Sequence, residues 1–207
     1  MLYTLIRYTI IPLTRALFRV KIIGRHNIPA TGGILAANHS DDSDPVFLSM
    51  ITRRKLYFMA KHNLKHDRIS VVLSRVKKYI LYIERRKGKS QPVIDQASEL
   101  VKHGNLFCMF PEGTTEGGKA ILKGHTGVAR ISLRSNAPVI PIAIINNHGC
   151  FPPGKLLPRK LPKVIINIGR PMSFPAYSGM QHNRKITRKV TNIIMKEIKS
   201  LYKEYEK

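Results

Sequence analysis

Short apolar runs alternate with amphipathic stretches along this chain. Apolar runs bounded by turn residues predict buried strands at 32–37, 56–60, 79–83, 106–110, 139–145 and 164–168. Helical spacing of apolar residues, with end signals such as glycine, predicts helices at 46–51, 69–76, 90–103, 124–135 and 183–203. Strands that alternate with helices favour an α/β fold, with a mixed, largely parallel sheet flanked by helices.

The first 21 residues differ from the rest and are expected to form an amphipathic N-terminal segment. Apolar residues between Leu2 and Val20 recur at helical spacing, three arginines punctuate that stripe, and Pro12 should kink or interrupt the helix. The pattern is typical of a helix that lies on a membrane surface, and a helix packed on its own domain has the same stripe. Residues 22–207 are expected to form a single domain, since no repeat or low-complexity linker divides them.

Positive charge dominates the composition. Lysine and arginine number 36 against 12 aspartate and glutamate residues, so the 207-residue chain has a formal net charge of +24. Such a charge points to an anionic partner: nucleic acid, anionic lipid, a phosphorylated substrate or an acidic carrier protein. Nucleic acid is the least favoured, because the chain has no tryptophan, zinc-finger spacing, helix-turn-helix signal or aromatic stacking motif. No run of about 18 apolar residues predicts an ordinary transmembrane helix.

The polar segment 38–45 offers the first candidate chemistry. It places His39 and Asp44 directly after an apolar run. The two side chains can meet only if the segment between them turns, and its aspartates and serine favour such a turn. If Asp44 accepts a hydrogen bond from one imidazole nitrogen, the other nitrogen is free to act as a base. The alternatives are a loop histidine without a role and an aspartate that caps the next helix.

A second polar loop, at 110–115, also follows an apolar run. Ligands gather at the carboxyl ends of strands in sheets of this class, so the two loops are expected to form one site. Gly113 allows close backbone approach, and free amides with threonine hydroxyls can hold an anionic oxygen. A plain strand-to-helix turn is the alternative. A serine nucleophile and a zinc site are disfavoured, since neither a Gly-x-Ser-x-Gly elbow nor zinc-ligand spacing occurs.

Four blocks of this sequence resemble the motifs of the glycerolipid acyltransferases, the lysophosphatidic acid acyltransferase family. The blocks are Asn38–Pro45, with its His-x4-Asp pattern, followed by Ile80–Arg85, Phe110–Thr114 and Val139–Ile142. They stand in the family's order and spacing across residues 33–145. A lone His-x4-Asp pattern is a weak signal, whereas four blocks in the correct order are a strong one.

The resemblance implies a reaction. His39 would deprotonate a hydroxyl of a lysophospholipid while Asp44 orients it, and the alkoxide would attack an acyl thioester without an acyl-enzyme. The expected acceptor is 1-acylglycerol 3-phosphate, which gives phosphatidic acid, and the alternatives are glycerol 3-phosphate or another lyso-lipid. The co-substrate would be a thioester of acyl carrier protein or coenzyme A, and no metal or other cofactor is implied. An inactive relative that only binds lipid is disfavoured by the intact His39, Asp44 and Glu112.

The resemblance also implies binding residues. Lys61 and Arg85 would hold the phosphate of the acceptor by charge-assisted hydrogen bonds. Glu112, Gly113 and Thr114 would shape the acceptor pocket. The enzyme would work as a peripheral or monotopic protein at the cytoplasmic face of a membrane, whose anionic lipids attract its basic residues.

Two positions depart from the family's pattern. Thr115 stands where the third motif usually continues with arginine, and Tyr79 stands where the second motif often has glycine. The first departure bears on how the phosphate is gripped and on which acceptor is used. Lysine and arginine residues just beyond Arg85 could supply compensating positive charge.

Overall fold

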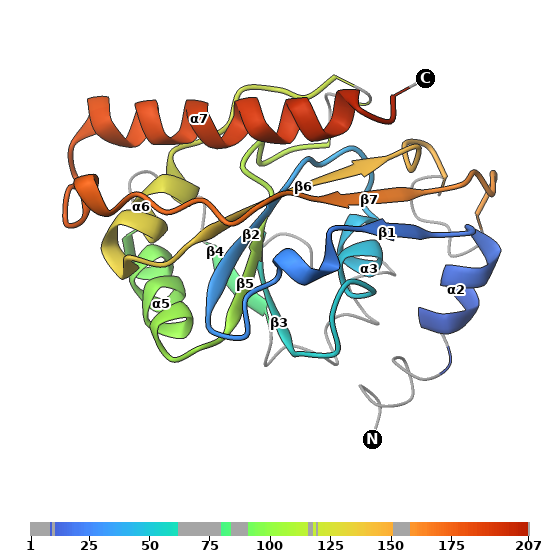
Figure 1. Cartoon of the computed structure of the whole chain (residues 1–207), viewed down its shortest axis with the longest axis horizontal. Helices are drawn as coiled ribbons and strands as arrows, with labels where there is room; N and C mark the ends of the chain where they lie inside the picture. The colour runs from blue at the N-terminus through green and yellow to red at the C-terminus, as the bar shows by residue number, and fades with distance from the viewer. Residues whose placement is uncertain are drawn as a thin grey trace.

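A mixed seven-stranded sheet runs through the centre of the computed structural model (Figure 1). Its order is β1-β7-β6-β2-β5-β3-β4. The strands are Lys21–Ile23 (β1), Gly33–Ala37 (β2), Leu56–Lys61 (β3), Ile80–Ile83 (β4), Leu106–Met109 (β5), Val139–Ile145 (β6) and Ile165–Ile168 (β7). The structure describes residues 9, 11–61, 80–83, 91–115, 118, 120–150 and 158–206.

All neighbouring strands are parallel except β6 and β7, which pair antiparallel. The central strand β2 pairs with β5 on one side and with β6 on the other. Every residue of β2 is buried, as expected for a parallel strand that is covered on both faces. Because the five strands from β2 to β6 share one direction, their carboxyl ends meet at one edge of the sheet.

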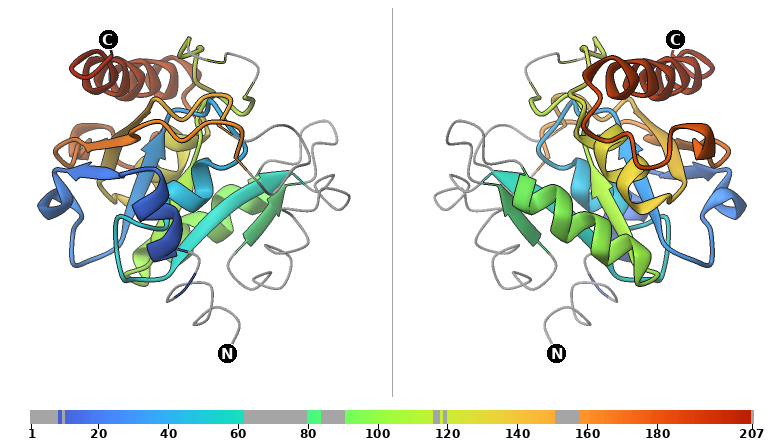
Figure 2. Two further views of the ribbon diagram at one scale, coloured as in Figure 1. Left: turned by 90° about the vertical axis from the view of Figure 1, so that its right-hand side faces the viewer. Right: turned by 90° about the vertical axis from the view of Figure 1, so that its left-hand side faces the viewer.

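Helices cover both faces of the sheet (Figure 2). The helices are Ile11–Leu17 (α2), Asp44–Leu48 (α3), Gln91–Lys102 (α5), Gly127–Ser135 (α6) and Arg184–Lys203 (α7), with short 3-10 helices at Arg25–Asn27 and Pro175–Tyr177. Alternate residues of β2 define the two faces. Ile34 packs with apolar residues of α5, α6 and α7, whereas Leu35 packs on the opposite face with Phe18 and Phe47. The sheet therefore lies between two layers, one of which holds the three longer helices.

The α/β class and the mostly parallel sheet predicted from the sequence are confirmed. Element ends differ in places. Helix α6 begins at Gly127 rather than at residue 124, because the amide of His125 donates to the carbonyl of Pro111 at 2.7 Å and holds that segment against the neighbouring loop. Strand β1 and the 3-10 helices are too short to show a periodicity. The helix expected at 69–76 lies outside the described residues.

The N-terminal segment is partly embedded in the domain and partly open to solvent. The ring of Phe18 is 1% exposed and meets the ring of Phe47 edge to face, with centroids 5.3 Å apart. On α2, by contrast, Leu13 is 62% exposed and Leu17 is 45% exposed. Residues 1–8 and 10 lie outside the described part, and Pro12, where a kink was expected, is the second residue of α2. No described helix combines the length and apolarity needed to cross a bilayer.

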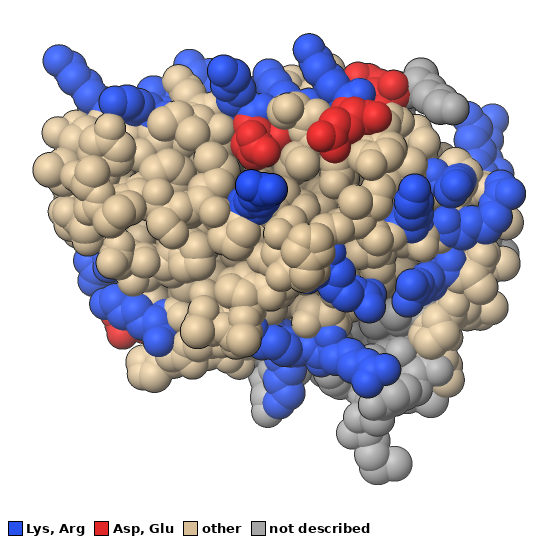
Figure 3. Space-filling view, viewed as in Figure 1, with Lys and Arg blue, Asp and Glu red and all other residues tan. Residues whose placement is uncertain are grey.

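Helix α7 is strongly amphipathic. Asn183 caps its first turn, since its side chain accepts hydrogen bonds from the amides of Lys185 and Ile186. Apolar residues such as Val190 and Ile194 are buried on the inner side. Lysine and arginine side chains occupy the outer side, and Figure 3 shows basic side chains along the upper edge of the molecule, over α7.

Phe18 should contribute strongly to stability. We expect Phe18→Ala to lower the free energy of unfolding by about 3 kcal/mol, because it leaves a cavity against Phe47. Leu13→Ala is the matched control, since Leu13 is largely exposed, and it should stay within about 0.5 kcal/mol of wild type. Urea unfolding of both variants checks this, and equal losses would contradict the packing described for Phe18.

Candidate active site

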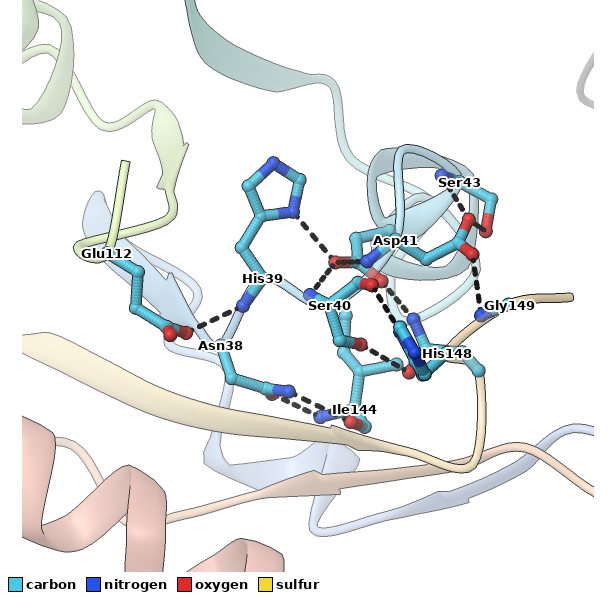
Figure 4. A network of polar contacts seen from close by, with 11 residues as sticks. Asn38, His39, Ser40, Asp41, Ser43, Glu112, Ile144, His148 and Gly149 are labelled. Atoms are coloured by element: carbon cyan, nitrogen blue, oxygen red, sulfur yellow. Dashed lines mark hydrogen bonds and ion pairs between the residues drawn. The ribbon is translucent and has the colours of Figure 1, made fainter. Parts of the chain in front are cut away.

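The site begins where β2 ends. There the side chain of Asn38 hydrogen-bonds to the backbone of the neighbouring strand β6. Asn38 donates from Nδ2 to the carbonyl of Ile144 at 3.0 Å and accepts at Oδ1 from the amide of Ile144 at 2.7 Å. One amide side chain thus satisfies both backbone groups of a residue on β6. This buried pair fixes the point at which the next residue, His39, leaves the sheet (Figure 4).

His39 and Asp44 are in direct contact. Nδ1 of His39 lies 2.8 Å from Oδ2 of Asp44, so the turn expected between them is present. An ionised carboxylate only accepts hydrogen bonds, so ionised Asp44 places the ring proton on Nδ1 and leaves Nε2 as the basic nitrogen. The His39 ring also stacks on Phe110, with centroids 4.1 Å apart and planes 14° apart. Its side chain stays 18% exposed, and Figure 4 shows the ring pointing away from Asn38 and Ile144.

The carboxylate of Asp44 is fully buried and densely hydrogen-bonded. Besides His39, Oδ2 accepts from the amides of Ser40 at 2.9 Å and Asp41 at 3.2 Å. The second oxygen, Oδ1, accepts from Nδ2 of Asn147. Burial raises the pKa of Asp44 above its ordinary value, and the hydrogen bond and charge of His39, with the two amides, oppose that rise.

The alternative role of Asp44, as the cap of the following helix, is wrong. Helix α3 begins at Asp44 itself, and Ser43 occupies the N-cap position. The Asp44 carboxylate instead accepts from amides that precede the helix, because it turns back toward His39.

Asp41 ties the same turn to the loop after β6. Its Oδ1 accepts from the amide and hydroxyl of Ser43, at 2.9 and 2.7 Å, and its Oδ2 accepts from the amide of Gly149 at 3.1 Å. The loop after β6 makes a second contact through Nδ1 of His148, which lies 3.0 Å from the carbonyl of Ser40. The turn between His39 and Asp44 is therefore held from the β6 side.

Glu112 braces the turn from the other side. Its Oε1 accepts from the amide of His39 at 2.8 Å, and its Oε2 accepts from the amide of Leu122 at 2.6 Å. The residue is 4% exposed, and burial raises its pKa while those two amides lower it. Both carboxylate oxygens are engaged with backbone, so Glu112 shapes the site by joining the loop after β5 to the start of the turn.

Of the other predicted binding residues, Gly113 and Thr114 lie in the loop after β5, and Lys61 lies at the end of β3. Gly113 has a φ of 68°, and a Cβ there would lie 3.2 Å from Cδ2 of His125, so the loop accepts only glycine without strain. Thr114 follows it and is half-buried. Lys61 is the last residue of β3 and pairs in register with Ile83, at the edge of the sheet where His39 emerges. Arg85 lies outside the described residues.

Comparison with known proteins identifies the family. The Acyltransferase family model matches residues 19–145, which contain His39, Asp44 and Glu112. The chain belongs to the Acyltransferase family.

Individual relatives agree with that family. A probable 1-acyl-sn-glycerol-3-phosphate acyltransferase of Mycoplasma pneumoniae is 21% identical over 90% of this chain and 72% of its own length. The 1-acyl-sn-glycerol-3-phosphate acyltransferase of Haemophilus influenzae is 25% identical over 64% of this chain, and this match spans only 57% of that relative. The crystal structure of the LPA acyltransferase PlsC from Thermotoga maritima shares the fold, with a TM-score of 0.64, 21% identity, and coverage of 93% of this chain and 81% of that one.

The groups near His39 in this acyltransferase are poorly suited to act as nucleophiles. The hydroxyl of Ser40 donates to Oδ1 of Asn147 at 3.0 Å. Burial, with the charges of Asp41 and Asp44, raises the pKa of Cys150 to about 12, so its thiol stays protonated near neutral pH. Within the part of the chain that the structure describes, no cluster of three or more histidine, cysteine or acidic side chains could hold a metal ion.

The sequence patterns of this acyltransferase did not predict three contacts of the site. The pairing of Asn38 with Ile144 and the contacts of Asn147 and His148 with the turn were not anticipated. One signal for the last two was available. The polar residues 146–148 follow an apolar strand, as do the two loops that the sequence singled out.

The two-sided bridge made by Glu112 should stabilise the fold. In Glu112→Gln the amide nitrogen cannot accept, so one buried backbone N–H loses its partner, at a cost of about 1–3 kcal/mol. Glu99→Gln makes the same change on an exposed side chain of α5 and should unfold at the same urea concentration as wild type. Indistinguishable midpoints for the two variants would contradict the bridge.

Proposed function

We propose that this protein transfers an acyl group from a thioester to the free hydroxyl of 1-acylglycerol 3-phosphate, which gives phosphatidic acid. The observation that carries the proposal is the His39–Asp44 pair. Nδ1 of His39 is held by a buried carboxylate, while Nε2 has no hydrogen-bond partner among the described residues. A histidine arranged in this way can accept a proton from a bound hydroxyl.

The proposed reaction proceeds in a single displacement. Nε2 of His39 takes the proton of the acceptor hydroxyl, and the oxygen attacks the carbonyl carbon of the thioester. The new C–O bond forms, the C–S bond breaks, and the departing thiolate takes the proton back from Nε2. Asp44 keeps the ring oriented and stabilises the imidazolium between the two proton transfers.

The acceptor phosphate is assigned to Lys61 and Arg85. The position of Lys61 at the carboxyl end of β3 supports this assignment, because β3 neighbours β5, whose following loop carries Glu112. Gly113 and Thr114 lie in that same loop and shape the acceptor pocket. The donor is a thioester of acyl carrier protein or coenzyme A, both of which are acidic and suit a chain with a net charge of +24.

A different acceptor is the second candidate. Thr115 stands where an arginine is expected in the third motif, so this loop supplies one positive charge fewer to a phosphate. Glycerol 3-phosphate or a lyso-lipid with another headgroup would be acylated by the same chemistry. The assay therefore has to compare acceptors.

A panel assay tests the function. Purified protein in lipid vesicles is offered lyso-phospholipids and glycerol 3-phosphate with each thioester donor, and the products are identified by mass. We expect acylation of 1-acylglycerol 3-phosphate to be the fastest reaction. Faster acylation of a phosphate-free acceptor would favour the second candidate.

Two histidine variants test the mechanism in that assay. His39→Ala should lower kcat by about 10³-fold or more while the protein remains folded, because the base is removed. His103→Ala is the control, because His103 is exposed in the turn just after α5, and it should retain full activity. Wild-type turnover in His39→Ala would exclude the proposed base.

The proposed site of action is the cytoplasmic face of a membrane, to which the protein binds peripherally. The exposed Leu13 and Leu17 of α2, with Arg15 between them, support this proposal. The double variant Leu13→Ser, Leu17→Ser should sediment with anionic vesicles about tenfold less than wild type. Leu161→Ser changes an exposed leucine elsewhere and is the control. Equal sedimentation of both variants would refute the role of α2.

A further inference from the structure

Asn147 is buried in the loop that follows β6, and its side chain contacts Asp44 of the proposed catalytic pair. Its residue is 1% exposed, although both ends of its side chain are polar. Nδ2 donates to Oδ1 of Asp44, and Oδ1 accepts from the hydroxyl of Ser40 at 3.0 Å. Neither the motif blocks nor the reaction described above assigns this residue any part.

The two oxygens of Asp44 are supported very differently. Oδ2 accepts from His39 and from the amides of Ser40 and Asp41, whereas Oδ1 accepts from Asn147 as its one donor among the described residues. Asp44 is inaccessible to solvent, so water does not replace that donor. Removing the Asn147 amide would leave one oxygen of a buried carboxylate without a partner, which is costly for the charged form.

The orientation of the Asn147 amide follows from the charge of Asp44. An ionised carboxylate needs a donor, so the NH2 group must face Asp44 and the carbonyl must face the hydroxyl of Ser40. The hydroxyl can donate to that carbonyl, which completes a chain from Ser40 through Asn147 and Asp44 to His39. Each group of the chain has a matching partner when Asp44 is ionised and Nδ1 of His39 carries the proton.

We infer that Asn147 is a positioning residue for acyl transfer, which fixes the Asp44 carboxylate against His39 by donating to its second oxygen. The catalytic part of this inference rests on the proposed function. The contact between Asn147 and Asp44 does not, and it can be tested without substrate.

Asp44 is surrounded by several other titratable groups. They lie on the turn, on the loop after β5 and on the loop after β6. They are His39, Asp41, Glu112, His148 and Cys150. None of them reaches Oδ1 of Asp44 by a hydrogen bond within the described part of the chain. A substitution at position 147 therefore changes the environment of that oxygen in a way that the other groups do not offset.

Asn147→Asp provides the sharpest test because it keeps the shape of the side chain. It replaces the donor by a second carboxylate in hydrogen-bond contact with Asp44, and two such groups cannot both ionise readily. We expect the midpoint for ionisation of Asp44 to rise by about one pH unit or more. Carbon-13 NMR of the side-chain carboxyl of Asp44, assigned with Asp44→Asn, measures that midpoint in the full chain.

Asn146→Asp is the matched control. It makes the same change one residue earlier on an exposed side chain that donates to the backbone carbonyl of Lys163 at 3.4 Å, and aspartate tolerates the positive φ of 67° found there. We expect the Asp44 midpoint to move by less than about 0.3 pH unit in this variant, because solvent screens the added charge. An equal shift in both aspartate variants would show a general charge effect and would overturn the assignment.

Kinetics distinguish positioning from a structural role. In Asn147→Asp the acid limb of the pH profile of kcat/KM should move to higher pH, because the proposed base works only with an ionised Asp44 beside it. Asn147→Ala should lower kcat by about 10–100-fold while KM for the acceptor stays within about twofold, because the orientation of His39 is disturbed and the substrate contacts are not. An unmoved midpoint and acid limb in folded Asn147→Asp would overturn the inference.

The two proposals can fail separately. If Asn147→Asp does not fold, Asn147→Ala serves the same NMR test, since loss of the donor also raises the Asp44 midpoint. Absence of acyl transfer by wild-type protein would refute the proposed function, and the NMR titration would still decide whether Asn147 governs the ionisation of Asp44.

Discussion

The site depends on holding one carboxylate, that of Asp44, entirely out of water. A buried charge is stable only if donors replace its hydration shell. Here the donors are His39, two backbone amides of the turn and the amide side chain of Asn147. Because the turn must bend to bring those amides to Oδ2, the same hydrogen bonds that satisfy the charge also determine where the imidazole stands.

The sheet makes this arrangement possible. The strands β2, β5 and β6 are neighbours and parallel, so the loops that follow them meet at one edge. Two side chains then join those loops through backbone groups: Asn38 binds Ile144 on β6, and Glu112 binds the amides of His39 and Leu122. The imidazole is thus held by contacts to the ends of three neighbouring strands. These contacts limit its movement, while Nε2 stays on the exposed side.

Charge and apolar surface are arranged separately on the outside of the molecule. Basic residues line the outer side of α7, which packs on one face of the sheet, while exposed leucines lie on α2 near the other. The residues after α2 are firmly held, since Phe18 is buried against Phe47 and β1 joins the sheet. Helix α2 is therefore anchored to the domain through the residues that follow it, and it exposes the apolar side chains of Leu13 and Leu17.

The fold class, the family and the His39–Asp44 pair could be predicted from the sequence alone. The predictions used local patterns and the order of the motif blocks along the chain. Apolar runs such as 139–145 must be buried, and in an α/β alternation they become strands of a shared sheet. The order of the four blocks pointed to the family that the comparisons then identified. The spacing of His39 and Asp44 indicated a pair, because the residues between them favour a turn.

Only the tertiary structure decided how the pair is held. The sequence indicated the contact of Asp44 with His39, but it did not predict the contact with Asn147, which lies 103 residues away in the chain and donates to the other oxygen of that carboxylate. Asn38 finds Ile144 across 106 residues, and Glu112 reaches the amide of His39 across 73. Such partners depend on which strands become neighbours, and neighbouring strands are chosen by the packing of the whole sheet. Local patterns can therefore name the candidate side chains of the site, while the long-range hydrogen bonds that orient them emerge only when the fold is complete.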